Sequence, residues 1–328
     1  MKIKYALVLF LFLFAALLSA GCSTFHERPT TTTTTTTTLY DWTAQASGTE
    51  QTLFEICFKD TTHGWAVGAA GIILRTTDAG LTWTTQSSGT TECLYDVACP
   101  AADTGVVVGD NGTVLRTIDA GLTWTAKTSN TSSRLYALDF GDAGNAWAVG
   151  GGDPAVIIKT TNGGNTWSTQ SSGTNDDLYG VAFADASNGW ACGSSGRIIH
   201  TDNGGATWTA QNSGTTSTLW AVHFADEEKG WAVGNSGLIL YTRDGGATWS
   251  IQTIATGNNL EGIDFADANT GWVVGALGTV FMTSDGGSNW HPETTPASAS
   301  YDLKALVFAD LATGWAVGTS GTILKYNP

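Results

Sequence analysis

The amino-acid sequence predicts an all-β protein, a seven-bladed β-propeller with four antiparallel strands in each blade. Three observations support this prediction. A turn that ends in tryptophan recurs six times, its tryptophans are almost evenly spaced, and each repeat contains four short apolar segments. A fixed period of about 40 residues is typical of propellers, solenoids and arrays, and four short strands per period favour the propeller.

The first repeat shows what each segment is expected to form. It contains LFEICF (53–58), GWAVG (64–68), GIILR (71–75) and, after the turn TTDAG, LTWTTQ (81–86). All four segments are too short for ordinary helices, carry β-branched or aromatic residues, and are bounded by turn-forming residues. Each segment therefore predicts one strand.

The turn phrase keeps the same outline through the chain. Its tryptophans are spaced 41, 43, 41, 41 and 41 residues apart. Its copies are TTDAGLTW (76–83), TIDAGLTW (117–124), TTNGGNTW (160–167), TDNGGATW (201–208), TRDGGATW (242–249) and TSDGGSNW (283–290).

The number of blades follows from the second strand, which has seven copies although the turn phrase has only six. At the start of the domain, DWTAQASG (41–48) matches TWTTQSSG (82–89), and Trp42 precedes Trp83 by 41 residues. The N-terminal strand is therefore predicted to complete the last blade as its outer strand. Residues 39–328 then close into a ring without free sheet edges, and we expect a monomer.

The residues before the propeller predict export and lipidation. Residues 1–21 have two early lysines, an apolar run and small residues, as a secretory signal peptide does. The segment LSAGC (18–22) resembles the lipobox of bacterial lipoproteins, which implies acylation of Cys22. Plain secretion is the alternative. Residues 22–38 end in nine threonines and predict a tether. The expected location is the cell envelope, at the outer membrane or on the periplasmic or cell-surface side, or the thylakoid lumen in a photosynthetic host.

Charge and cysteine content exclude several partners and cofactors. The chain has 14 basic and 29 acidic residues, and loss of Lys2 and Lys4 with the signal leaves a formal charge of about −17. This charge argues against nucleic acid and anionic lipid headgroups as partners. No CxxC pair occurs, so no metal site or cofactor is expected. Cys57 and Cys99 fall on the first strands of neighbouring blades, and they could either form a disulfide or remain free buried thiols.

The turn phrase has the form S/T-x-D-x-G-x-x-W and resembles the Asp-box of bacterial neuraminidase repeats. We expect a structural role, in which the acidic side chain accepts hydrogen bonds from the turn, glycine supplies a positive φ, and tryptophan covers the hairpin. Asparagine in two copies suits an acceptor and would not serve as an acid. No catalytic residue is expected, because the Arg-Ile-Pro signature and arginine triad of sialidases are missing. The structural positions are Asp78, Asp119, Asn162, Asn203, Asp244 and Asp285.

Over residues 39–328, the repeat L-x-x-V-x-F-x-D-x-x-x-G-W-A-V-G-x-x-G-x-I-L-x-T-x-D-G-G-x-T-W resembles that of the photosystem II stability and assembly factor family. The resemblance implies a seven-bladed propeller that is lipidated in cyanobacteria, binds a newly made reaction-centre subunit and has no catalytic site. We therefore expect a non-enzymatic, lipid-anchored protein that binds a protein partner and helps to assemble or stabilise a membrane or envelope complex. A carbohydrate-binding or glycan-cleaving surface protein is the alternative, and a structural surface protein is another.

That family has an arginine-rich surface patch thought to hold its partner. In this sequence, cations recur directly before the turn phrase, and the predicted partner-binding residues are Arg75, Arg116, Lys159, His200 and Lys325. The alternative is that these cations pair with acids that recur before the second strand. These acids are Asp60, Asp142, Asp185, Asp226, Asp267 and Asp310.

The first strands offer a second candidate site, in the central channel. Their alternate positions carry Glu55, Asp96, Asp139, His223 and Asp264, which could bind a cation or a ligand. The alternative is a set of separate polar groups wetted by channel water. The neighbouring aromatic residues are expected to pack between blades rather than to form a sugar platform. They are Phe54, Tyr95, Tyr136, Tyr179 and Trp220.

Overall fold

The computed structural model describes residues 41–296 and 301–327. The predicted signal peptide (1–21), the predicted lipidated Cys22 and the tether (22–38) lie outside the described residues.

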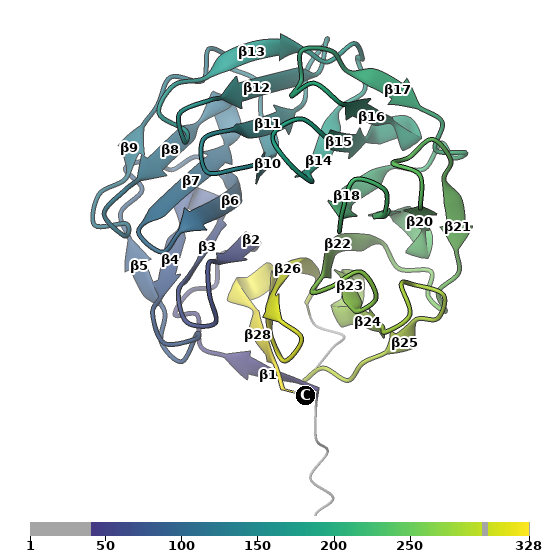
Figure 1. Ribbon diagram of the computed structural model, residues 1–328. Coiled ribbons are helices and arrows are strands. Elements are labelled where there is room, and N and C mark those ends of the chain that lie inside the picture. Colours follow the sequence, from purple (N-terminus) through teal and green to yellow (C-terminus); the bar gives the residue numbers. More distant parts are fainter. Residues whose placement is uncertain (1–40, 297–300, 328) are drawn as a thin grey trace, which may run out of the picture. The chain divides into compact units, whose positions relative to one another are not determined.

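The described residues form seven four-stranded antiparallel sheets around a central channel, which confirms the predicted propeller (Figure 1). We name the strands of each blade A to D from the channel outward. In that order they are β2 (Leu53–Phe58), β3 (Gly64–Gly68), β4 (Ile73–Thr76) and β5 (Thr84–Gln86) in blade 1; β6 (Leu94–Ala101), β7 (Thr104–Gly109), β8 (Val114–Thr117) and β9 (Thr125–Ala126) in blade 2; β10 (Leu135–Phe140), β11 (Ala146–Gly150), β12 (Val156–Thr160) and β13 (Ser168–Ser171) in blade 3; β14 (Leu178–Phe183), β15 (Gly189–Gly193), β16 (Ile198–Thr201) and β17 (Thr209–Gln211) in blade 4; β18 (Leu219–Phe224), β19 (Gly230–Gly234), β20 (Ile239–Thr242) and β21 (Ser250–Gln252) in blade 5; β22 (Leu260–Phe265), β23 (Gly271–Gly275), β24 (Thr279–Thr283) and β25 (His291–Pro292) in blade 6; and β26 (Leu303–Asp310), β27 (Thr313–Gly318), β28 (Ile323–Tyr326) and β1 (Trp42–Gln45) in blade 7.

The predicted ring closure is present in blade 7. Strand β1 pairs antiparallel with β28, with Trp42 opposite Tyr326. The backbone N–H of Asn327 donates to the carbonyl of Asp41 (2.7 Å), and the indole N–H of Trp42 donates to Glu293 Oε2 (2.6 Å) in blade 6. The first strand therefore holds the last blade to the rest of the ring.

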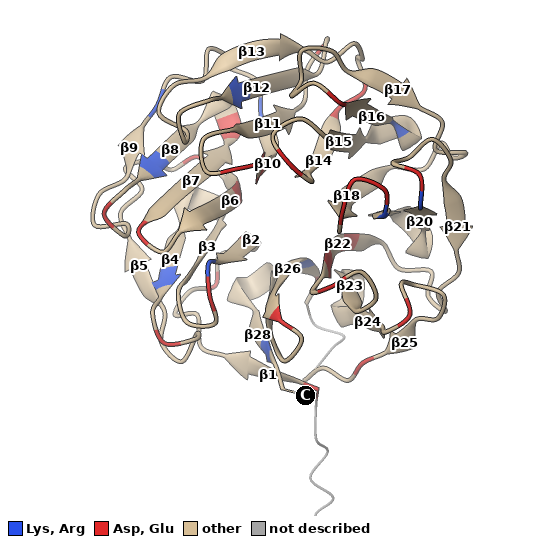
Figure 2. Cartoon of the chain, viewed as in Figure 1, with Lys and Arg blue, Asp and Glu red and all other residues tan. Residues whose placement is uncertain are grey.

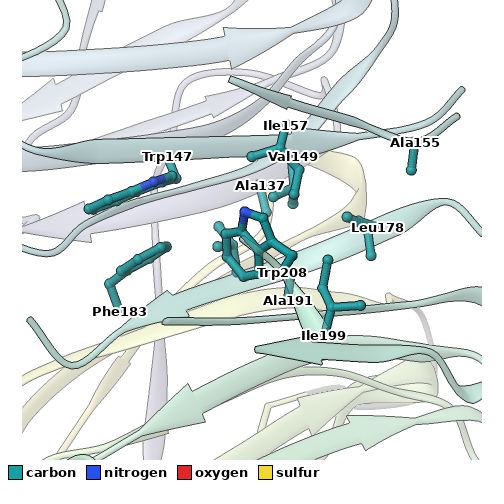
Figure 3. Packing of buried hydrophobic residues seen from close by; sticks show 11 residues of the cluster. Ala137, Trp147, Val149, Ala155, Ile157, Leu178, Phe183, Ala191, Ile199 and Trp208 are labelled. Carbon is teal, nitrogen blue, oxygen red and sulfur yellow. The ribbon is translucent and has the colours of Figure 1, made fainter. Parts of the chain in front are cut away.

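The core lies between the blades, where tryptophans of strand B stack on phenylalanines of strand A in the next blade. Trp147 and Phe183 are parallel within 8°, with ring centroids 3.6 Å apart (Figure 3). Aromatic burial on this scale dominates packing energies. Four other joints have the same stack, namely Trp315–Phe58, Trp190–Phe224, Trp231–Phe265 and Trp272–Phe308.

The joint between blades 1 and 2 is built differently. Cys99 occupies the position that phenylalanine holds in other blades, and it forms a disulfide with Cys57 of blade 1. Cys93 and Cys192 form no disulfide with another described residue. A covalent link therefore stands where Trp65 has no phenylalanine to stack on.

Each Asp-box forms a tight turn between strands C and D. In blade 2, Asp119 accepts hydrogen bonds from the backbone N–H (2.9 Å) and hydroxyl (2.6 Å) of Thr123. Those bonds hold the pKa of Asp119 at about 2. Asn162 accepts the equivalent backbone bond from Thr166 at 2.9 Å. An acceptor is therefore all that the turn requires at this position.

Candidate functional site

Cationic side chains on strand C lie over the tryptophans of strand B. Arg75 pairs with Trp65 across the sheet and Lys159 pairs with Trp147. The guanidinium carbon of Arg75 is 5.0 Å from the Trp65 ring centroid, and Lys159 Nζ is 4.6 Å from that of Trp147. These distances are those of cation–π contacts. Figure 2 shows basic residues on β4, β8 and β12 of three consecutive blades.

The other predicted partner-binding residues occupy equivalent positions. His200 stacks on Trp190 with ring centroids 4.8 Å apart, and Lys325 Nζ lies 5.7 Å from the Trp315 centroid. Arg116 faces Val106, because blade 2 lacks the tryptophan. All five predicted partner-binding side chains are half-buried.

Three of these cations also tie one blade to the next. Arg116 Nε donates to the carbonyl of Gly163 (2.6 Å), and Lys159 Nζ donates to that of Gly204 (2.9 Å). The guanidinium of Arg75 reaches the carbonyl of Ala102 at 3.4 Å. Burial lowers the pKa of Arg75 and of Lys159.

The alternative that these cations pair with the acids before strand B is wrong for Arg75, Arg116, Lys159 and Lys325. None of them forms an ion pair with a carboxylate within residues 41–296 and 301–327. The acids instead close their own loops. Asp60, for example, accepts from the backbone N–H groups of Thr62 (2.7 Å) and His63 (2.8 Å).

Sequence reasoning missed large exposed apolar side chains in the turns that follow Arg75 and Arg116. Leu81 and Leu122 are 77% and 85% exposed in the C–D turns of blades 1 and 2, and Ile118 is 61% exposed. Blade 1 contacts the second of these turns, because Gln86 at the end of its strand D donates to the carbonyl of Ala120 (3.0 Å) in blade 2. The signal was available, since the residue after the last glycine of the turn phrase is leucine only in these two copies.

The second candidate site is brought together by the fold. Glu55, Asp96, Asp139, His223 and Asp264 all line one central cavity of about 610 Å³. This volume is within the range of about 300–1,000 Å³ typical of ligand pockets.

Three of the channel carboxylates connect neighbouring blades. Asp96 accepts from the backbone N–H of Leu138, and Asp139 accepts from that of Phe183, each at 2.7 Å. Asp264 accepts from the N–H of Phe308 at 2.7 Å and lies 3.3 Å from His223 Nδ1. These groups are therefore part of the ring's structure and are not only wetted by channel water.

The protein surroundings shift the pKa of each channel group toward its neutral form. Burial raises the pKa of Asp96 and of Asp139 to about 7. Burial, together with the charge of Asp96, raises the pKa of Glu55, and burial also raises that of Asp264. Burial lowers the pKa of His223. Asp96 and Asp139 therefore lose or gain protons near neutral pH.

The aromatic residues of strand A contact one another from blade to blade, as expected, but they do so on the channel side and not on the face that Ile56 shares. Neighbouring ring centroids along Phe54, Tyr95, Tyr136, Tyr179 and Trp220 are 5.1, 5.6, 5.0 and 4.7 Å apart. A β-bulge after the first residue of strand A leaves the second residue without a partner on strand B. The bulge breaks the simple alternation of faces and turns these side chains into the channel.

In blades 6 and 7 the aromatic residues give way to an ion pair. Lys304 Nζ lies 2.8 Å from Glu261 Oε2, and both residues line the cavity.

Within the described ranges, no three His, Cys, Asp or Glu side chains are grouped so that they could hold a metal ion. None of the short helical turns described is long and apolar enough to cross a membrane.

Comparison with known families gives a match over most of the chain. The sequence matches the family described as photosynthesis system II assembly factor YCF48 at residues 34–93, 83–174, 167–254, 209–268 and 250–327. No curated protein matches the sequence.

Solved structures share the fold at low sequence identity. One described as YCF48 bound to D1 peptide has a TM-score of 0.74 and 19% identity over 89% of this chain and 96% of that one. YCF48 from Cyanidioschyzon merolae has a TM-score of 0.73 and 22% identity over 88% and 99%. The GH74 enzyme of Niastella koreensis has a TM-score of 0.68 and 16% identity over 87% of this chain and 53% of that one. Such identities establish the fold alone.

Proposed function

Since the chain belongs to the family of the photosynthesis system II assembly factor YCF48, we propose that it binds a polypeptide and assists the assembly or stability of a membrane or envelope complex, without catalysing a reaction. A similar structure is described as YCF48 bound to D1 peptide, which supports a polypeptide ligand. The channel carboxylates that bond to backbone N–H groups are engaged in structure, which favours a non-enzymatic role.

One surface carries this proposal. We call it the blade 1–2 surface, made of Leu81, Ile118, Leu122, Arg75 and Arg116. Large exposed apolar side chains on neighbouring blades, close in sequence to charged groups, are candidates for contact with another protein. The surface fits a partner segment that has apolar side chains and acidic groups.

The anchoring and location of the protein are proposals from the sequence alone. Acylation of Cys22 would hold the propeller at a membrane of the cell envelope, and the threonine tether would let the blade 1–2 surface reach a membrane-bound partner. A Cys22→Ser variant tests this proposal by fractionation, since loss of the lipid should move the protein from the membrane to the soluble fraction.

The binding proposal is tested by crosslinking a tagged copy in the native host and identifying what co-purifies. The test variant is Leu81→Ser with Leu122→Ser, which changes only exposed side chains. Each leucine buried on binding contributes about 1.5 kcal/mol, so partner capture should fall by about 100-fold.

The matched control is Ile251→Ser, which removes a side chain that is 64% exposed on strand D of blade 5. Capture of the same protein by the leucine variant and by wild type would refute the proposed surface. Capture of glycan instead of protein would favour the carbohydrate-binding alternative.

A further inference from the structure

The aromatic side chains of the channel form an arc at the end opposite the blade 1–2 surface. The hydroxyl of Tyr95 donates to Asp110 at 3.3 Å, and the indole of Trp220 donates to Asn235 at 2.8 Å. Asp110 and Asn235 begin the short turns between strands B and C. Because the strands are antiparallel, these turns lie at the opposite end of each blade from the C–D turns of Leu81 and Leu122.

The geometry of the arc suits a narrow object that it can surround. Neighbouring rings are tilted to one another by 35° to 67°, so they do not form the flat platform on which a sugar ring stacks. Within the protein itself, two of these rings already contact a cation. The guanidinium carbon of Arg134 lies 5.4 Å from the Tyr95 centroid and 5.6 Å from that of Tyr136.

Most of the ionisable side chains inside the channel are acidic. Lys304 is the one Lys or Arg among the described residues that line the cavity, and its ammonium group pairs with Glu261. Glu55 directly follows the first aromatic residue of the arc. Its Oε1 accepts from its neighbour's backbone N–H at 3.0 Å, while its Oε2 has no hydrogen-bond partner among the described residues. The cavity therefore offers a carboxylate oxygen to an incoming donor.

We infer that the channel mouth binds a basic side chain of a polypeptide, a lysine ammonium or an arginine guanidinium, with the aromatic arc around its stem and Glu55 and Asp96 at its charged end. The inference rests on the proposed function in that the bound molecule is a polypeptide, but it uses the other face. Cation–π contact and carboxylate pairing both favour a cation over an anion or a neutral group.

A pH dependence follows from the groups that face the site. A bound cation favours the ionised carboxylates, so peptide affinity should rise between pH 6 and pH 8 as Asp96 and Asp139, whose pKa values are about 7, lose their protons. Protonation of His223 at lower pH would add repulsion in the same direction. The charged or titratable side chains that line the cavity are Glu55, Asp96, Asp139, His223, Glu261, Asp264, Lys304 and the tyrosines Tyr95, Tyr136 and Tyr179, and Arg134 contacts two of those tyrosines.

The test uses fluorescein-labelled peptides of sequence GSGXGSG and fluorescence anisotropy with the folded protein at low ionic strength. X is lysine, arginine, norleucine or glutamate. We expect the lysine and arginine peptides to bind at least tenfold more tightly than the norleucine peptide. Equal binding of lysine and norleucine peptides to the wild type would overturn the inference without any variant.

Variants locate the site. Glu55→Gln should weaken binding of the lysine peptide at least tenfold, and the matched control Glu227→Gln, in an exposed loop of blade 5, should leave it unchanged. Unaltered binding to Glu55→Gln would also overturn the inference. If that variant unfolds, as its thermal midpoint will show, the wild-type comparison still decides.

The two proposals fail separately. The protein could still capture its partner in the native host while lysine and norleucine peptides bind equally. That result would support the proposed function and refute the site in the channel.

Discussion

Replacing Trp42 by alanine tests how strongly the first strand clamps the ring. The indole is fully buried, lies 5.8 Å from the Phe308 ring centroid in an edge-to-face contact, and donates to Glu293. Loss of a buried tryptophan costs about 3–5 kcal/mol. We expect the upper end, about 5 kcal/mol, because Glu293 also loses a hydrogen-bond donor in a site where burial already raises its pKa.

Equilibrium urea unfolding and a thermal scan measure this cost. In a domain of this size, about 1 kcal/mol corresponds to about 2 °C in the thermal midpoint, so Trp42→Ala should melt about 10 °C below wild type. The control is Trp83→Ala at the equivalent position of blade 1. Trp83 is only partly buried and its indole nitrogen has no hydrogen-bond partner among the described residues, so its loss should cost less. An equal or smaller loss in Trp42→Ala would show that the closing strand does not clamp the ring.

Two further predictions concern the channel acids and the disulfide. The folded state keeps protons on Asp96 and Asp139 up to about pH 7, whereas the unfolded state loses them near pH 4, so stability should increase as pH falls from 8.5 to 6.5. Below about pH 6.5 the unfolded state protonates His223 first and opposes the gain. Scanning calorimetry at constant ionic strength checks this, and a midpoint that is flat or falls toward pH 6.5 would contradict it. The Cys57–Cys99 disulfide closes a loop of 42 residues and should contribute about 4 kcal/mol to stability in the loop-entropy model. Reductant should therefore lower the urea midpoint. Alkylation of the unreduced, denatured protein provides a second check, because four reactive thiols within residues 41–327 would show that no disulfide forms.

The fold could be predicted because its information is repeated. The same pattern of strands and turns recurs in each blade. The last repeat lacks its outer strand and the domain begins with an extra copy of it, which places the strand of Trp42 beside that of Tyr326. Packing between blades also follows from the buried tryptophan of strand B. The order of strands therefore needed no knowledge of long-range contacts.

The candidate sites were predicted less well, for two physical reasons. The β-bulge in strand A is a backbone feature without a residue signature, so simple alternation placed Tyr95 and Trp220 on the wrong face. The alternative for Arg75 and Lys159 was pairing with carboxylates, but backbone carbonyls of the next blade accept from these donors instead. Every residue carries a backbone carbonyl, so the sequence does not indicate which carbonyl will accept a given hydrogen bond.

The pairing of the first strand with the last also sets the order in which the protein can fold. Thr43 and Asn327 are hydrogen-bonded although 284 residues separate them. A ribosome makes the first of these residues long before the second, and contacts between distant residues are the slow ones in folding. Six blades can assemble in turn as the chain appears, but β1 has no partner until β28 has been synthesised. The first strand to be made is thus among the last to be used.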